Sequence, residues 1–127
     1  MVYRIEQNGL LHINIHAEKQ PHLPFLPRFG LRFFLNQAFN KVDYIGYGPI
    51  ESYLDKHHAT AFGRYKTTPE SNHVPYLKPQ ENGSHYGCRE VKVANSSDCF
   101  TVQSRTPFSM NVSPYSQEEL GSKKHQY

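Results

Sequence analysis

The chain has no tryptophan, only two cysteines and no long apolar run in its 127 residues. A membrane helix needs about 20 apolar residues and a disulfide-stapled scaffold needs many cysteines, so the sequence predicts neither. Its 14 basic and 11 acidic residues are scattered, with no basic run longer than Lys123-Lys124, which argues against a nucleic-acid partner. Met1 to Glu6 lack a secretion signal, so we expect a cytoplasmic location, or a periplasmic one if a leader precedes this segment in a longer parent polypeptide.

Aromatic residues supply much of the limited apolar content. Hydrophobic residues make up 37% of the chain and the mean hydropathy is −0.70, but 9 tyrosines and 8 phenylalanines can bury a large area per residue. This supply fits one partial domain with a modest core over residues 1–127.

The patterning is mostly that of β-strands. Strands over Val2–Gln7 and Leu10–His16 flank Asn8-Gly9, the strongest short hairpin signal. Leu31–Leu35 is apolar except for Arg32 and predicts a strand buried on both faces. Further strands are predicted over Val42–Gly46, Tyr86–Val93, Phe100–Gln103 and Phe108–Val112.

Two connections interrupt these strands. Gln20–Pro27 holds three prolines and predicts an extended crossing segment. Thr67–Ser84 is polar and punctuated by proline and glycine, which predicts a long irregular loop of the kind that often carries function. Near the end of the chain, Ser116 is placed to cap a short helix with Glu118 and Glu119 in its first turn. The sequence therefore predicts an all-β, antiparallel fold with a short C-terminal helix.

The two cysteines are predicted to be free thiols. The strands on either side of Asn95–Asp98 form a hairpin whose register would place Cys99 opposite Ala94 and Cys88 near Arg105. That separation is too large for a disulfide, and free thiols fit a reducing compartment.

The segment Tyr44–Lys56 carries the most distinctive loop chemistry. Gly46 and Gly48 tolerate backbone angles that a side chain forbids, and Pro49 fixes the direction in which the chain leaves the turn. Such a segment can stay a tight, mobile turn while it presents polar and aromatic groups to a ligand. The candidate substrate-loop residues are Gly46, Gly48, Pro49, Glu51, Tyr53 and Asp55.

Carboxylates in this loop raise the question of glycoside hydrolysis. That reaction needs two carboxylates facing one sugar, about 5 Å apart for retention and farther apart for inversion. Glu51 and Asp55 are the nearest pair, and Glu81 is a third candidate. The alternative, which we favour, is that Glu51 caps the turn after Pro49 and Asp55 pairs with Lys56. No Gly-x-Ser-x-Gly elbow frames a serine nucleophile either, so we assign no catalytic residue.

The eight histidines form no metal-binding motif. His12 and His16 share one face of a strand but lie about 13 Å apart, and adjacent residues such as His57-His58 seldom chelate one ion together. Neither Cys-x-x-Cys nor His-Glu-x-x-His occurs. We assign no metal site and no cofactor to this chain.

Five segments occur together in an order that points to one family. They resemble the C-terminal, small-chain domain of the large bacterial β-galactosidases of glycoside hydrolase family 2, and the resemblance runs from about Arg28 onward, with Val2–Glu18 matching the preceding strands. The segments are Arg28-Phe-Gly-Leu-Arg, Tyr44-Ile-Gly-Tyr-Gly-Pro-Ile-Glu-Ser-Tyr-Leu-Asp-Lys, Pro75-Tyr-Leu-Lys-Pro-Gln-Glu-Asn-Gly, Gly87-Cys-Arg-Glu and Phe108-Ser-Met-Asn-Val-Ser-Pro-Tyr-Ser.

The resemblance implies an incomplete antiparallel β-supersandwich of the galactose mutarotase type. It also implies that the loop Gly48–His57 is mobile and closes toward the active site, that Glu51 matches the family's loop glutamate, and that Asn82 and Gly83 form an architectural turn. The family's catalytic glutamates lie on a TIM barrel that this chain lacks, and its magnesium and sodium ligands also lie elsewhere in the parent.

We therefore expect an accessory fragment, inactive alone, of a retaining β-galactosidase that acts on terminal β-D-galactosides such as lactose. Its partners would be the rest of the parent and, through it, the substrate. An incomplete sandwich exposes strand edges and apolar surface, which predicts self-association.

Two alternatives remain open: a stand-alone carbohydrate-binding or mutarotase-like module, weakened by the missing tryptophan, and a structural assembly domain. Six tyrosines near the loops could stack on a sugar or could serve the core: Tyr44, Tyr47, Tyr53, Tyr65, Tyr76 and Tyr86.

Overall fold

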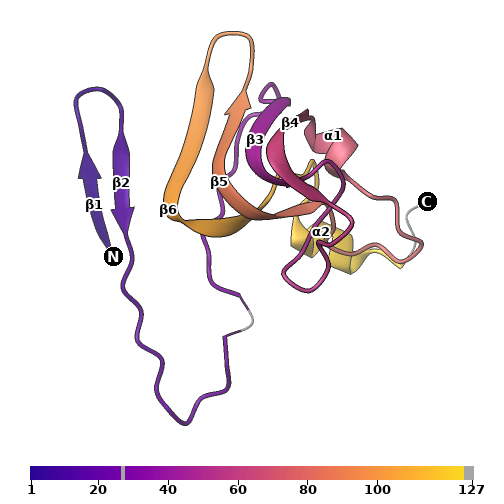
Figure 1. The fold of residues 1–127 in the computed structure, drawn as a ribbon, viewed down its shortest axis with the longest axis horizontal. Coiled ribbons are helices and arrows are strands. Elements are labelled where there is room, and N and C mark those ends of the chain that lie inside the picture. Colours follow the sequence, from indigo (N-terminus) through magenta and orange to yellow (C-terminus); the bar gives the residue numbers. More distant parts are fainter. Residues whose placement is uncertain (27, 125–127) are drawn as a thin grey trace. The chain divides into compact units, whose positions relative to one another are not determined.

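A computed structural model describes residues 1–26 and 28–124, and the chain divides into two compact units, Met1–Phe33 and Phe34–Tyr127. The first unit holds a hairpin of β1 (Val2–Ile5) and β2 (Leu11–Asn14) (Figure 1). The predicted connection 20–27 carries no strand from 20 to 26, and Pro27 lies outside the described residues.

The hairpin turn confirms the Asn8-Gly9 signal. Gly9 has φ +83°, the left-handed region that glycine adopts readily, and its N–H donates to the Glu6 carbonyl at 3.0 Å. The Asn8 Oδ1 accepts from the Leu10 N–H at 2.9 Å. Both strands are shorter than predicted because their pairing runs only from the Val2–Asn14 pair to the Ile5–Leu11 pair.

One face of this hairpin is apolar and uncovered. The register places Tyr3 opposite Ile13 and Ile5 opposite Leu11, and Ile5 is 78% exposed. An isolated two-stranded hairpin is marginally stable in water. Its exposed apolar face is compatible with the expected self-association, which stays a prediction.

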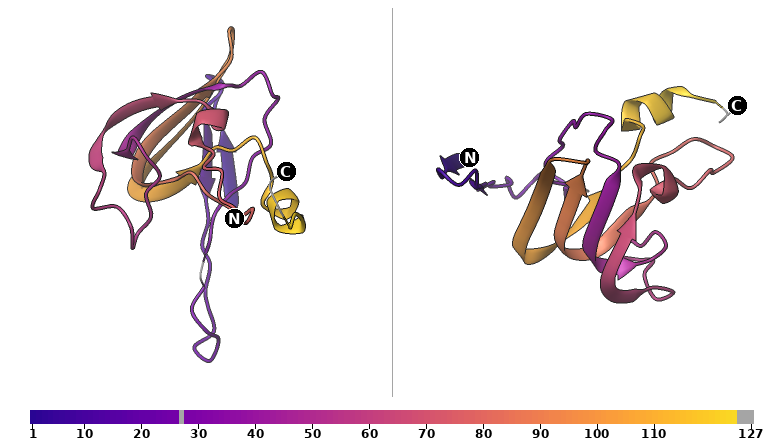
Figure 2. Two further views of the ribbon diagram at one scale, coloured as in Figure 1. Left: turned by 90° about the vertical axis from the view of Figure 1, so that its right-hand side faces the viewer. Right: turned by 90° about the horizontal axis from the view of Figure 1, so that it is seen from above.

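The second unit is built on a four-stranded antiparallel sheet in the order β4-β3-β5-β6, and the strands lie side by side in this order in Figures 1 and 2. The described part of this unit also contains the short helices α1 and α2. The bounds are β3 Lys41–Gly48, β4 Ala61–Thr67, α1 Pro69–Asn72, β5 Ser84–Ala94, β6 Cys99–Asn111 and α2 Gln117–Ser122.

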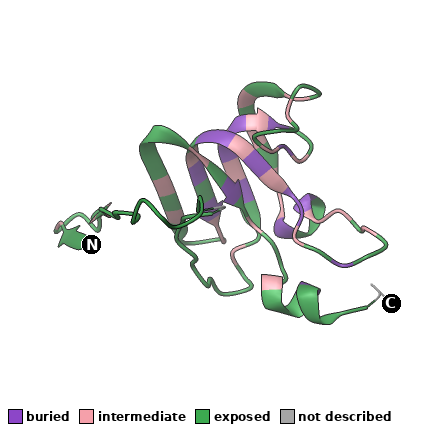
Figure 3. Cartoon of the chain, turned by 90° about the horizontal axis from the view of Figure 1, so that it is seen from below, coloured by how far each residue is buried: buried purple, intermediate pink, exposed green. Residues whose placement is uncertain are grey.

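The core lies on one face of the sheet. Val42 and Tyr44 of β3 pair with Val93 and Val91 of β5, and alternation along each strand sends these four side chains to the same side. Figure 3 shows buried residues concentrated on β3 and β5 and exposed residues along much of β6. The opposite face is charged: Arg64 of β4 lies 3.2 Å from Asp43 and 3.0 Å from Glu90. The core comprises Val42, Tyr44, Cys88, Val91, Val93 and Met110, with Phe39, Tyr65, Phe108 and Val112 packed against it.

The predicted strand over Leu31–Leu35 was wrong. Among the described residues the segment pairs with no strand, and its five residues are exposed, Phe34 at 81%. A run of apolar residues becomes a central strand only where neighbours offer a ladder on both sides. The four strands of the sheet pair with one another instead.

The prediction of separate strands over Phe100–Gln103 and Phe108–Val112 was also wrong, because one continuous strand, β6, covers both. The Asn95–Asp98 hairpin and the pairing of Cys99 with Ala94 are confirmed. Irregularities around Cys88 shift the register, however, so Cys88 pairs with Phe108 rather than lying near Arg105.

Both cysteines are free, as predicted, with Cys88 buried and Cys99 exposed. Strand β4 was not predicted, and the irregular Thr67–Ser84 segment contains the helix α1. The C-terminal helix α2 is confirmed, since the Ser116 hydroxyl accepts from the Glu119 N–H at 3.1 Å as an N-cap.

The fold is thus all-β and antiparallel with short helices, and its one larger sheet agrees with an incomplete sandwich. Among the described residues, no helix is long and apolar enough to cross a membrane.

Candidate functional site

The predicted loop begins at the end of β3, where two glycines make room for neighbouring side chains. A Cβ on Gly46 would lie 2.7 Å from the Cys88 sulfur, and one on Gly48 would lie 2.8 Å from the Tyr65 ring and closer still to the Tyr44 hydroxyl. Neither glycine has a positive φ. The expectation that they supply unusual backbone angles was therefore wrong: they are required for space. The Gly48–Pro49 peptide bond is cis.

Glu51 is the most constrained side chain of the loop. Its carboxylate accepts hydrogen bonds from the Tyr53 hydroxyl at 3.0 Å and from the Gly83 N–H at 3.0 Å. It also accepts from the Tyr76 hydroxyl and lies 3.4 Å from the Lys56 ammonium, while its side chain is only 9% exposed. Two segments far apart in sequence therefore meet at this carboxylate.

The hydrogen bonds at Glu51 change the ionisation of the groups around it. Burial acts to raise the pKa of the Glu51 carboxyl, but the donors from Tyr76, Gly83, Tyr53 and Lys56 outweigh it and lower that pKa below its ordinary value. The same contacts raise the partners' pKa values: burial and then Glu51 raise the pKa of Tyr53, and the bond to Glu51 raises the pKa of Tyr76. At neutral pH the cluster is a carboxylate held by protonated phenols.

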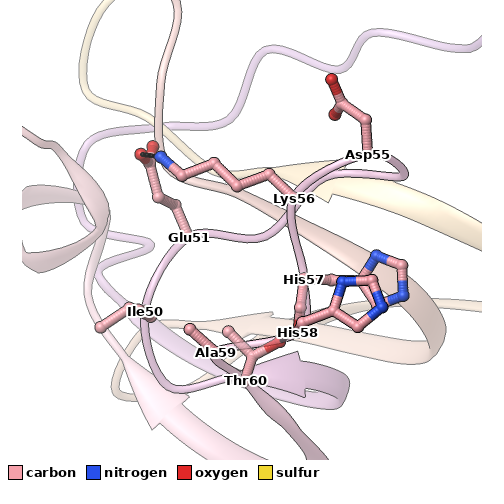
Figure 4. Close-up of a pocket in the computed structure, with 8 residues that line it drawn as sticks. All are labelled: Ile50, Glu51, Asp55, Lys56, His57, His58, Ala59 and Thr60. Carbon is pink, nitrogen blue, oxygen red and sulfur yellow. Dashed lines mark hydrogen bonds and ion pairs between the residues drawn. The ribbon is translucent and has the colours of Figure 1, made fainter.

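Asp55 is turned away from this cluster. Figure 4 shows Lys56 reaching back to Glu51 while the Asp55 carboxylate points in another direction. The expected Asp55–Lys56 pair was wrong, because the ion pair of Lys56 is with Glu51. The expectation that Glu51 secures the turn after Pro49 is supported by its four donors. Glu51 and Asp55 are therefore not brought together as a facing pair of acid and base.

Two shallow cavities lie beside the loop. One of about 250 Å³ is bordered by Ile50, Glu51 and the segment 55–60, where the His57 and His58 rings stack with centroids 4.8 Å apart (Figure 4). The other, of about 330 Å³, lies between Pro49–Glu51 and α1, with His85 among its lining residues. Among the described residues, no group of three or more His, Cys, Asp or Glu side chains is placed to hold a metal ion.

A buried histidine fixes the base of the loop to α1. His85 is 1% exposed, and its Nε2 lies 3.1 Å from the Asn72 Oδ1. Its Nδ1 lies 2.9 Å from the Tyr44 hydroxyl and 3.1 Å from the Tyr47 carbonyl oxygen. Burial lowers the pKa of His85, which keeps the ring neutral.

The turn formed by Asn82 and Gly83 is architectural, as predicted. The Asn82 Oδ1 accepts from the Val74 N–H at 2.7 Å and its Nδ2 donates to the Gln80 carbonyl at 2.9 Å. Gly83 has φ +71° and packs against the Asn72 backbone. This turn presents the Gly83 N–H to Glu51.

Sequence reasoning did not identify Tyr76 as a partner of the loop or Ser52 as the loop residue that bonds to the sheet. Tyr76 was counted only as an aromatic near the second loop, because its bond to Glu51 joins residues 25 positions apart and leaves no local signal. Tyr44, also counted there, is a core residue at 1% exposure. The burial of a polar residue such as Ser52 likewise cannot be predicted from the local sequence, because it depends on partners that are distant along the chain.

Acid should loosen this site. Because the folded-state pKa of Glu51 is below the 4.5 of an unperturbed glutamate, its contribution to stability is complete above pH 4.5 and is lost as the pH falls through the lower, folded-state value. We expect the difference in free energy of unfolding between the native chain and Glu51→Gln to be largest near pH 6 and to shrink toward pH 3. Chemical denaturation at stepped pH measures this, and a difference that grows on acidification would contradict it.

Comparison with known proteins places this arrangement in a family. The family described as "Beta galactosidase small chain" matches residues 1–127. The chain belongs to this family. The fold, the Glu51 cluster and the Asn82–Gly83 turn are therefore features of a β-galactosidase small-chain domain.

The relatives of this small-chain domain are much longer than the chain itself. It is 54% identical over 125 residues to a β-galactosidase of Actinobacillus pleuropneumoniae, covering 98% of this chain and 12% of that protein. It is 35% identical over 130 residues to a β-galactosidase of Streptococcus thermophilus and 34% over 125 residues to one of Staphylococcus xylosus. The match to the Streptococcus protein covers 100% of this chain and the match to the Staphylococcus protein covers 98%. Each match covers 13% of the relative.

Proposed function

We propose that this chain is an accessory domain of a β-galactosidase that hydrolyses terminal β-D-galactosides with retention of configuration. The observation that carries the proposal is the 54% identity, across 98% of the chain, to a protein named β-galactosidase. Within the chain, the Glu51 carboxylate is occupied by four donors and Asp55 points elsewhere, so neither is set up as half of a catalytic pair. The chemistry is assigned to the rest of the parent.

The part of this domain proposed to cover the active site is the loop Gly48–His57. Its exposed members, Ile50 at 57% and Leu54 at 72%, together with Asp55, provide apolar and charged surface that a neighbouring pocket could use. Closing loops exclude water and complete a binding site, and their motion often limits turnover. The magnesium and sodium implied by the family resemblance belong, in this proposal, to the rest of the parent. The location is proposed as cytoplasmic, with the periplasm as the alternative.

The test is the hydrolysis of a chromogenic β-galactoside by the full-length parent and, in parallel, by the 127-residue chain. We expect activity in the full-length protein and none above background in the chain alone. Hydrolysis by the chain alone would contradict the accessory role, and its carboxylates would then be the first residues to replace. Absence of hydrolysis in the full-length protein would contradict the proposed activity.

A further inference from the structure

The start of the proposed covering loop is held firmly to the sheet. Ser52 is fully buried; its N–H donates to the Ser84 carbonyl at 2.7 Å and its hydroxyl donates to the Tyr47 carbonyl at 3.2 Å. The same hydroxyl oxygen accepts from the Tyr86 N–H at 2.9 Å. A loop that swung as a whole about Gly48 would have to break all three bonds, together with those of Glu51.

Beyond this anchor the loop forms a separate tight turn. The backbones of Tyr53 and Lys56 exchange hydrogen bonds of 2.9 and 3.1 Å, and Leu54 and Asp55 protrude between them. The side chains of Tyr53 and Lys56, which flank the turn, both return to the Glu51 carboxylate. One largely buried carboxylate thus contacts both residues that flank the protruding turn, and the His57 Nδ1 lies 3.0 Å from the Tyr53 carbonyl.

We infer that Glu51 is a clamp that fixes the 53–56 turn against the 73–84 connection, and that Tyr76 is a positioning residue for the proposed substrate loop. The clamp itself is inferred from the contacts of Glu51. Only the statement that the loop covers an active site rests on the proposed function. Tyr76 is the side chain that ties Glu51 to the 73–84 connection, and its hydroxyl donates to the oxygen that Lys56 also approaches. Hydrogen bonds to a charged acceptor are among the stronger contacts of a folded protein. Removal of this one should therefore loosen the link between Glu51 and the 73–84 connection, which then depends on the Gly83 N–H.

The clamp also decides which loop side chain can meet a ligand. Glu51 and the Tyr53 hydroxyl are engaged with each other, so neither is free to bind a sugar while the clamp is closed. Asp55 is exposed and points away from the clamp (Figure 4). The protruding turn with Asp55, rather than Glu51, is therefore the face that the loop offers to the rest of the parent.

The experiment compares Tyr76→Phe with the native sequence in the full-length protein. Limited proteolysis with trypsin reports opening of the turn through cleavage after Lys56, because cleavage under native conditions follows the population of the open state. We expect this cleavage in Tyr76→Phe to be roughly tenfold faster or more, as loss of a bond to a charged acceptor implies. With a chromogenic β-galactoside, we expect kcat/KM to fall several-fold, through KM more than through kcat, with little change in Tm.

The control is Tyr115→Phe, which removes the hydroxyl of an exposed tyrosine that packs on His73 and lies outside both loops; its cleavage rate at Lys56 should match the native one. In a Glu51→Gln background, Tyr76→Phe should add little, because the two residues act as one unit. Unchanged cleavage at Lys56 in Tyr76→Phe would overturn the clamp, as would full additivity with Glu51→Gln. If the full-length protein hydrolyses no β-galactoside, the proposed function fails, and faster cleavage in Tyr76→Phe still supports the clamp.

Discussion

Gly83→Ala should unfold the sheet unit of this chain or leave it barely stable. A Cβ at this position would collide with the Asn72 carbonyl oxygen and lie 3.0 Å from the carbonyl carbon, and both atoms belong to the backbone at the end of α1. Alanine would also have to adopt φ +71°, which alone costs about 1–2 kcal/mol. Relief of the collision would pull Gly83 away from Glu51 and break the clamp. We expect a loss of about 4 kcal/mol or more, a large part of the stability of a small domain.

Chemical denaturation of the chain followed by circular dichroism would measure this loss. The matched control is Gly9→Ala, because Gly9 has a similar φ of +83° but open space around its Cα. Gly9 lies in the hairpin unit, so the control should leave the unfolding of the sheet unit at the native value. A loss for Gly83→Ala no larger than about 1–2 kcal/mol, the cost of the φ angle by itself, would refute the packing explanation.

Gly48→Ala should lower stability by about 3 kcal/mol, because it overfills the core at the end of β3. The added methyl group would displace Tyr44, which is 1% exposed, and would break the bond between its hydroxyl and His85. Overpacking typically costs about 1–3 kcal/mol, and a buried polar group left without its partner costs about 1–3 kcal/mol more. A change in turnover of the full-length parent carrying Gly48→Ala would therefore not by itself demonstrate a glycine hinge.

The control for this substitution is Gly121→Ala. Gly121 lies in α2 with nothing within 4 Å of an added Cβ, so alanine should be neutral or stabilise the helix by up to about 1 kcal/mol. Thermal denaturation of both variants makes the comparison. A Gly48→Ala variant as stable as the native chain, but slower in the full-length protein, would revive the hinge interpretation.

Local signals in the sequence predicted local structure well. The Asn8-Gly9 turn needs only its own backbone angles and one side-chain acceptor, and the Ser116 cap needs a donor three residues away. Such features are encoded within a few residues. Both were found where the sequence placed them.

Features that depend on distant partners were missed or misassigned. The apolar run Leu31–Leu35 looked like a central strand but has no ladder to join, whereas β4, with Phe62, Arg64 and Lys66 on one face, has few apolar residues and is a strand because β3 lies beside it. The register of Cys88 failed because β5 and β6 do not pair residue for residue.

The candidate site shows the same division. Family motifs placed the Asn82–Gly83 turn correctly, since that segment has a distinctive composition. The role of the Gly48–His57 loop stays a prediction. The role of Glu51 depends on a tyrosine 25 residues away and on a backbone N–H 32 residues away. No pattern in the sequence specifies that these three groups converge.

The irregular pairing between β5 and β6 bears on how copies of this chain could associate. Strand β6 is an edge of the sheet, and a long edge strand offers its unpaired backbone groups to another chain. Pro107 lies inside β6 and has no N–H to donate, and the register shifts near Cys88 interrupt the regular spacing that a second sheet would have to match. Pro107 and these register shifts therefore work against a continuous backbone ladder between a second copy and the whole of β6.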